Sequence, residues 1–271
     1  MFNISGASIR QFMAAAGLGA IFAVPAFAAP DYHPITPDAE GKTITLTGHD
    51  LSIEDVLAVA RHGAKVRYSP EAIQRAADGE DLRAEAGAEN IPVYGLNRGS
   101  GALREVQMKR DEFVQLSNAR RGAKEGVLPE IADEDLVRAF LVIRANSVPF
   151  EASGPEFMHL LVDLLNKRVT PVMYSRGTLG EGDLFLTSNF LATMVGRGDA
   201  YYQGVRMSAA EALKKAGLKA LSSRIGGGTS NAYADALAVL LVADGREALE
   251  WADLIHGMDK LGMNSSVTPR S

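Results

Sequence analysis

Three short glycine-rich segments hold the residues of this chain whose types and spacing could support catalysis. They are residues 90–104, 180–183 and 226–229. Glycine adopts backbone angles that other residues avoid, so such segments can bring side chains and backbone N–H groups close to a bound molecule. The chemistry to expect from them is proton transfer and the binding of an anion.

Tyr94, in the first segment, is a candidate catalytic residue. A phenol accepts a proton only as the phenolate, and the positive charge of the neighbouring Arg98 would favour that form. The alternative is that Tyr94 is a buried aromatic residue whose hydroxyl group bonds to the backbone. Both interpretations stay open at this point.

The other two segments each allow two interpretations. Glu181, between two glycines, could serve as an acid or base, or it could simply close a short turn with Asp183 capping the next helix. Gly226-Gly-Gly-Thr229 precedes an expected helix and could bind a carboxylate at the helix N-terminus. Alternatively it is a flexible entry into that helix. The glycine run lacks the βαβ surroundings of a dinucleotide-binding site.

The elements that must position these segments are expected to be mainly helical. Hydrophobic spacing and capping residues predict one short strand and seven helices. The strand is expected at 43–47, and the helices at 51–61, 70–86, 112–124, 133–146, 155–168, 209–217 and 231–256. Ser52 and Ser69 are the expected caps of the first two helices. The last helix is apolar over much of its circumference and should therefore be buried on several sides.

Composition excludes several classes of function. The 271 residues carry a formal net charge of −5 without a basic run, which argues against a nucleic-acid partner. There is no cysteine, and hence no disulfide, thiolate metal site or cysteine nucleophile. The five histidines are not spaced as metal ligands, so no metal site is expected.

The N-terminus resembles a signal peptide. Arg10 precedes an apolar run from Phe12 to Val24, and Ala26-Phe-Ala28 fits a cleavage signal. We expect residues 1–28 to be removed and the mature chain to be periplasmic or secreted, without a membrane association after cleavage. The alternative is an uncleaved membrane anchor.

Six segments occur in a characteristic order between about Ile44 and Gly262. They are Val93–Gly101, Val137–Ser147, Val169–Val172, Arg176–Leu184, Ala209–Leu218 and Ile225–Asn231. Together they resemble the histidine/phenylalanine ammonia-lyase family, the aromatic amino acid lyases. The resemblance implies a mainly α fold, with a small N-terminal α+β part built around an inner loop at 91–104, followed by the long helices of a bundle.

The resemblance also implies the roles of the candidate site residues. Tyr94 would be the base that takes a proton from a small amino-acid-like substrate, and Glu181 is the second catalytic candidate. Substrate contacts would come from Asn97, Arg98, Gly101, Gly227 and Thr229. Family members are tetramers with active sites shared between subunits, so a homo-oligomer is expected.

The chain departs from the family where the prosthetic group forms. In the family an Ala-Ser-Gly triplet cyclises into an electrophilic methylidene-imidazolone. Here Gly180 is followed by Glu181, Gly182 and Asp183, so one Glu replaces Ala and Ser. Without that Ser no dehydroalanine can form, and no cofactor is expected. The family asparagine that helps hold the group falls on Gly227, which agrees with its loss.

The resulting hypothesis is a C–N lyase that eliminates an amine from an amino acid of histidine, aromatic or betaine type, leaving an α,β-unsaturated acid. The alternative is a catalytically inactive, truncated relative that acts in binding or assembly. The expected organisation is a signal peptide at 1–28, a linker at 29–43, a lyase-like domain at 44–205, and the start of a truncated helical bundle at 206–271.

Overall fold

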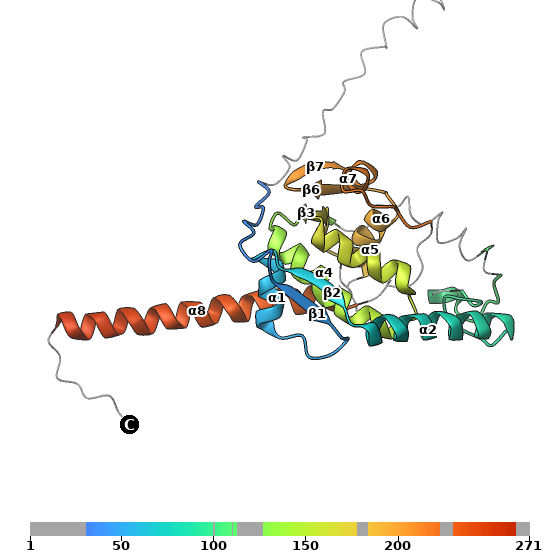
Figure 1. Ribbon diagram of the computed structural model, residues 1–271, viewed down its shortest axis with the longest axis horizontal. Helices are drawn as coiled ribbons and strands as arrows, with labels where there is room; N and C mark the ends of the chain where they lie inside the picture. Colours follow the sequence, from blue (N-terminus) through green and yellow to red (C-terminus); the bar gives the residue numbers. More distant parts are fainter. Residues whose placement is uncertain are drawn as a thin grey trace, which may run out of the picture.

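The computed structural model describes residues 31–99, 101–109, 111–112, 127–177, 184–222 and 230–263 (Figure 1). The fold is mainly α, as expected. Its helices are α1 (Ile53–Ala60), α2 (Pro70–Ala88), α4 (Glu134–Ser147), α5 (Pro155–Asn166), α6 (Leu184–Met194), α7 (Ala209–Lys215) and α8 (Ala232–Gly262), with short 3-10 helices η1 (Gly101–Leu103) and η3 (Val148–Phe150). The helix expected at 112–124 lies almost wholly outside the described residues.

The strands form three small sheets. β1 (Thr43–Leu46) pairs in parallel with β2 (Lys65–Tyr68), with Thr43 opposite Lys65. β3 (Val127–Glu130) and β5 (Tyr174–Arg176) are antiparallel. The third sheet has the order β4-β6-β7 and is antiparallel throughout. Its strands are β4 (Val169–Pro171), β6 (Asp199–Tyr202) and β7 (Val205–Ser208).

The caps read from the sequence explain where the first helices begin. The Ser52 hydroxyl accepts the backbone N–H of Asp55, and the Asp55 carboxylate accepts the Ser52 N–H in return, which completes a capping box. Ser69 caps α2, with Pro70 at its first position. Local chemistry at these ends therefore confirms both predicted starts.

Helix α4 lies at the centre of the core. It is buried on nearly all sides, with Phe140 fully buried and Leu136 and Ile143 partly buried. It packs against α1, α5 and α8. The chain thus wraps the small sheets and the other helices around one central helix (Figure 1).

Two arginines of α4 are fully buried, and both have backbone or carboxylate partners. Arg138 donates to the carbonyl of Val59 over 2.8 and 3.1 Å and to that of Leu165 over 3.2 Å. These carbonyls belong to the last turns of α1 and α5, where the helix dipole is negative. Burial lowers the pKa of Arg138 to about 10, which leaves it charged at neutral pH.

The segment Arg144-Ala-Asn146 ties α4 to its neighbours. Arg144 forms an ion pair with Glu151 after η3. The amide oxygen of Asn146 accepts the N–H of Gly48 over 3.1 Å. The carbonyl of Ala145 accepts the hydroxyl of Tyr68 over 3.0 Å. These three residues therefore join α4 to the β1–α1 connection and to β2.

The N-terminal segment lies against the domain instead of forming a simple linker. We expected a linker at 29–43, yet the ring of Tyr32 stacks on Tyr201 of β6 with 3.6 Å between centroids. The backbone N–H of Ile35 donates to the buried carboxylate of Glu134 over 2.9 Å. Residues 31–42 are thus part of the packed structure.

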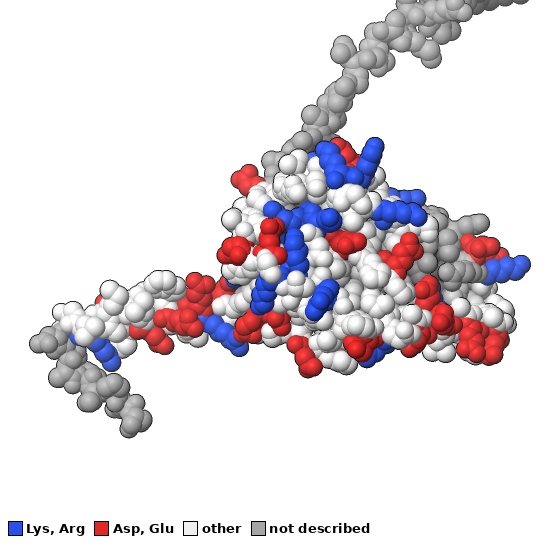
Figure 2. Space-filling model, viewed as in Figure 1, with Lys and Arg blue, Asp and Glu red and all other residues white. Residues whose placement is uncertain are grey.

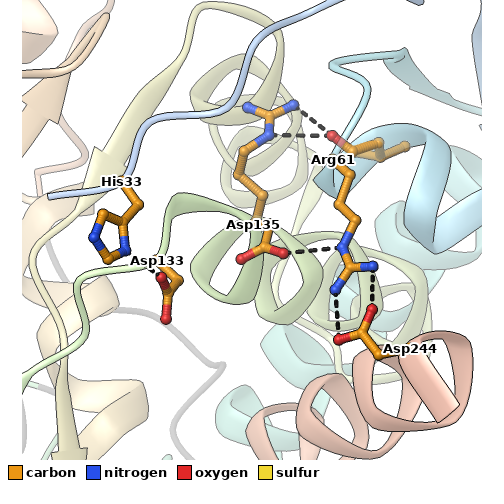
Figure 3. A network of polar contacts seen from close by, with 7 residues as sticks. His33, Arg61, Asp133, Asp135 and Asp244 are labelled. Atoms are coloured by element: carbon orange, nitrogen blue, oxygen red, sulfur yellow. Dashed lines mark hydrogen bonds and ion pairs between the residues drawn. The ribbon is translucent and has the colours of Figure 1, made fainter. Parts of the chain in front are cut away.

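Arg61, at the end of α1, connects three helices (Figure 3). Its guanidinium lies 3.0 Å from a carboxylate oxygen of Asp135 on α4 and 3.0 Å from one of Asp244 on α8. The Arg61 hydrogen bond holds the pKa of Asp244 below its usual range. Beside them His33 Nδ1 lies 2.7 Å from Asp133 Oδ1.

The boundary expected between residues 205 and 206 falls inside β7, which pairs with β6 along its whole length. Helix α7 packs on the same sheet. Residues 206–222 that the structure describes therefore continue the N-terminal part, and the bundle begins with α8.

Helix α8 differs most from expectation. It has 31 residues and runs to Gly262, six residues beyond the expected end at His256. Its N-terminal half packs on α4 and α1, but its C-terminal half leaves the body and is exposed (Figure 1). We expected α8 to be buried on several sides, but the described residues do not cover its C-terminal half. Among the described helices, none combines the length and apolar character needed to cross a membrane.

Replacing Arg138 by Met should lower the free energy of unfolding by about 3 kcal/mol, because the last-turn carbonyls of α1 and α5 would be buried without a donor. Urea denaturation followed by circular dichroism measures this. Arg104→Met, at a side chain 68% exposed, is the control and should change stability by less than about 0.5 kcal/mol. Equal effects of the two substitutions would contradict the structural role of Arg138.

Candidate functional site

The candidate site is built on the loop that follows α2. Helix α2 ends at Ala88, and the N–H of Ile91 bonds back to the carbonyl of Ala86 over 2.9 Å. The chain then turns tightly, with the N–H groups of Leu96 and Arg98 both directed at the carbonyl of Val93. The turn has a fixed position at the end of a long helix.

Asn97 fixes this turn with its side chain. Its amide oxygen accepts the N–H of Val93 over 2.8 Å, and its amide nitrogen donates to the carbonyl of Ile91 over 2.7 Å. Both ends of the amide group are therefore bonded within the loop. Asn97 therefore positions the loop backbone, whereas the sequence analysis expected it to contact the substrate.

Two glycines of the loop are required by its geometry. Gly95 has φ of 73°, in the left-handed region. A Cβ on Gly99 would collide with the backbone of Leu103. The N–H of Gly99 bonds to the carbonyl of Val106 over 3.0 Å, so this close approach is part of the loop's closure.

Tyr94 is exposed at the tip of this turn, with 64% of its surface accessible. The alternative of a buried aromatic residue is therefore wrong. Its hydroxyl oxygen does have a backbone partner, the N–H of Gly101, at 3.1 Å. Tyr94 thus presents its phenol to solvent from a loop that holds the oxygen in place.

The structure brings the inner-loop candidates together. The backbone of Arg98 bridges to that of Tyr94, and the carbonyl of Arg98 accepts the N–H of Gly95. Gly101, with φ of 58°, places its N–H on the Tyr94 oxygen. Glu181, Gly227 and Thr229, together with the segments around them, lie outside the described residues.

A cavity of about 770 Å³ lies between the C-terminal half of α2 and the loop. Among the described residues that line it, Asn97 is the candidate predicted from sequence, and Tyr94 is not included. The lining residues are Glu80, Arg83, Ala84, Gly87, Asn90, Leu96, Asn97, Gln107, Met108, Lys109 and Glu112. Its volume is in the range of small-molecule sites.

The charged residues of the cavity were missed by sequence reasoning. Glu80 and Arg83 come from α2, whereas Lys109 and Glu112 come from beyond the loop. In the sequence, Glu80 and Arg83 look like ordinary solvent-facing residues of a helix. Lys109 and Glu112 look like part of a separate polar segment. Acidic and basic side chains thus line the same cavity. A cavity of this kind suits a zwitterion such as an amino acid. In the part of the chain that the structure describes, no cluster of three or more His, Asp or Glu side chains could hold a metal ion.

Comparison with known proteins identifies relatives of most of the chain, from residue 51 onward. The sequence model of the family described as aromatic amino acid lyase matches residues 51–271. A histidine ammonia-lyase of Treponema denticola is 36% identical over 220 residues, which cover 79% of this chain and 43% of the relative. The matched part of the chain therefore spans less than half the length of this relative.

Solved structures agree with the fold. An ergothioneine-degrading ergothionase from Treponema denticola, in complex with desmethyl-ergothioneine sulfonic acid, has a TM-score of 0.70 at 29% identity, covering 74% of this chain and 42% of the other. A histidine ammonia-lyase from Trypanosoma cruzi has a TM-score of 0.71, covering 83% of this chain and 44% of the other. At 18% identity the latter shows the fold alone.

Substituting Asn97 by Ala should loosen the loop, because Val93 N–H and the Ile91 carbonyl both lose their partner. We expect amide exchange at Val93 to accelerate by about tenfold, as measured by hydrogen–deuterium exchange. In Asn97→Asp the carboxylate can still accept from Val93, so exchange there should stay closer to wild type. If Asn97→Ala leaves Val93 exchange unchanged, the side chain does not hold the turn.

Proposed function

The chain belongs to the aromatic amino acid lyase family, and from that premise we propose that it acts in an ammonia-lyase-type elimination. A base removes a proton from the carbon β to the carboxylate, the C–H electrons form the C=C bond, and the C–N electrons leave with the amine. The product is an α,β-unsaturated acid. Because the match covers only 43% of the histidine ammonia-lyase of Treponema denticola, the activity of this chain is itself part of the proposal.

The observation that carries the proposal is the position of Tyr94. Its phenol is exposed on a turn that Asn97 fixes, and Leu96 and Asn97 of that turn line the cavity. A base must combine access to substrate with a defined position. Arg98 and Gly101 would support it, Arg98 by its charge and Gly101 by its N–H to the phenol oxygen. In this proposal Glu181 supplies the second acid or base, and Gly227 and Thr229 help bind the substrate carboxylate.

We further propose that the reaction proceeds without a methylidene-imidazolone. The residues at Gly180–Asp183 do not fit that group, since its formation needs a Ser between Ala and Gly. An amine that leaves without electrophilic activation suits this site, and a quaternary ammonium is such a group. Ergothioneine, for which the structural relative is named, is a betaine that carries one. We therefore place a betaine derived from an amino acid first among candidate substrates.

A second candidate function is binding or assembly without catalysis. It is favoured by the C-terminal half of α8, whose apolar side chains are exposed in the described structure. In this case the lyase scaffold would persist as part of a complex. Homo-oligomerisation and export through residues 1–28 belong to either proposal as predictions.

Turnover should be detectable as amine release when the folded protein is offered histidine, phenylalanine, tyrosine and their trimethylated betaines. Tyr94→Phe should abolish that release, because it removes the proton acceptor. Tyr202→Phe, on β6, is the matched control and should retain activity. Absence of turnover with every compound, in a protein shown to be folded, would favour the binding function, and full activity of Tyr94→Phe would exclude Tyr94 as the base.

The cofactor proposal is tested by mass spectrometry independently of activity. Trypsin cleaves after Arg176 and Arg197 and releases the peptide Gly177–Arg197, which contains Glu181. We expect the mass calculated from its unmodified residues. A mass reduced by the loss of water would show that the segment has cyclised or dehydrated and would overturn the proposal.

A further inference from the structure

The cavity between the C-terminal half of α2 and the inner loop is separate from the phenol of Tyr94. Tyr94 is not among the described residues that line the cavity, whereas Leu96 and Asn97 of the same turn are. Leu96 is buried, while the phenol is exposed to solvent. A molecule in this cavity would therefore contact the turn that carries Tyr94 without being presented to the phenol oxygen.

One wall of the cavity is a face of α2. Its lining residues are Glu80, Arg83, Ala84 and Gly87. Their spacings of three, four and seven residues keep them on one side of the helix. From the first to the last of them the helix rises by about 10 Å, at about 1.5 Å per residue. That span is enough for a molecule of amino-acid size.

The opposite wall is the segment that follows the loop. The N–H of Met108 donates to the carbonyl of Asn97 over 3.0 Å, which ties this wall to the turn. The amide nitrogen of Gln107 donates to the amide oxygen of Asn90 over 3.1 Å, which ties it to the chain just beyond α2. Hydrogen bonds thus hold the two walls to each other and to the turn.

Two charged groups of the cavity are left for a ligand. The carboxylate of Glu112 already accepts the backbone N–H of Lys109 over 3.0 Å. Within the described part of the chain, neither the carboxylate of Glu80 nor the ammonium group of Lys109 has a hydrogen-bond or ion-pair partner. One carboxylate and one ammonium group therefore line the same cavity with their charges unpaired.

The surroundings of the cavity disfavour a ligand that carries only negative charge. The C-terminal half of α2 also carries Asp81, Glu85 and Glu89. Figure 2 shows acidic side chains over this end of α2 on the face in view. Their field repels a carboxylate, and an ammonium group in the same molecule offsets that repulsion. A ligand for this cavity should therefore carry a positive group beside its negative one.

The rest of the lining is partly apolar, with side chains from Ala84, Leu96 and Met108. We propose that the cavity is a second small-molecule site, which binds a free amino acid with an aliphatic side chain. The ammonium group of the ligand meets Glu80, its carboxylate meets Lys109, and its side chain packs on the apolar residues.

The occupant of this site acts on the turn and is not the molecule that reacts. It contacts Leu96 and Asn97, so it binds the ordered turn and not an opened one. Such a ligand suppresses opening in proportion to its concentration. The amino acid is therefore an effector that fixes the position of Tyr94. This role does not rest on the proposed elimination and applies equally to a protein that only binds.

L-Leucine is the probe, because it has all three groups and neither an aromatic ring nor a trimethylated amine. Calorimetric titration of the folded protein should show saturable binding. Isocaproate lacks the ammonium group and isoamylamine lacks the carboxylate, so each should bind at least about tenfold more weakly. The absence of saturable leucine binding would overturn the proposal, and so would binding of either analogue as tight as that of leucine.

Glu80→Gln and Lys109→Gln each remove one charge from the cavity, and each should weaken leucine binding by about tenfold. Glu85→Gln and Arg104→Gln are the matched controls, because neither residue lines the cavity, and both should bind leucine as the wild type does. Equal weakening by test and control variants would show a response to net charge alone and would contradict the site. Circular dichroism checks that each variant is folded.

Tyr94→Phe distinguishes this site from the proposed catalytic one. Because Tyr94 does not line the cavity, this variant should retain leucine binding whatever happens to amine release. Loss of leucine binding in Tyr94→Phe would place the ligand at the phenol and overturn a separate site. Failure of the elimination alone would leave the leucine result unchanged.

Hydrogen–deuterium exchange tests the effect on the turn. With leucine at about ten times its dissociation constant, the amides of Leu96 and Met108 should exchange about tenfold more slowly. The amide of Val66, which donates to Asn166 beside the β1–β2 sheet, is the internal control and should not change. Unchanged exchange at Leu96 and Met108 with saturating leucine would overturn the effector role.

Discussion

The buried guanidinium of Arg138 is the interaction on which the arrangement of this domain depends. It bonds the last turns of α1 and α5 at once, from the middle of α4. A charge inside an apolar core is stable only when its donors are satisfied, and here the negative ends of two helices satisfy them. The three helices are thereby fixed at one point, and the small sheets and α2 are arranged around them.

The candidate site depends on this frame through α2. Ala72 and Ala76 of α2 are fully buried, and the guanidinium of Arg75 lies 4.5 Å from the ring centre of Phe150 at the end of η3. Helix α2 therefore carries the inner loop on a rigid support. Within the loop, Asn97 provides the final local constraint on Tyr94. A defined position for an exposed phenol thus follows from packing contacts far from it.

Several elements could be predicted because their signals are local. The caps Ser52 and Ser69 and the apolar spacing of 155–168 correctly predicted α1, α2 and α5, since capping and periodicity act within a few residues. The segments shared with the lyase family predicted the inner loop and placed Tyr94 on it. The fold class followed from the same information.

Other features depend on partners distant in sequence. In the sequence, Arg138 looks like an ordinary polar residue of a helix. Its role becomes visible only when the carbonyls of Val59 and Leu165 are known to accept its hydrogen bonds. The cavity combines α2 with residues beyond the loop, and nothing in either segment alone indicates a shared site. The length of α8 was underestimated, since an end at residue 256 was expected and the helix continues to Gly262, where its side chains are exposed.

The stacking of Tyr32 on Tyr201 has a consequence for the order in which the domain is made. Tyr32 leaves the ribosome early, but the ring it packs against is synthesised nearly 170 residues later. The N-terminal segment must therefore wait until β6 has emerged before its place in the structure exists. The contact of Tyr32 therefore forms late in synthesis although its residue is made early, and a nascent chain that stalls before β6 would keep Tyr32 exposed.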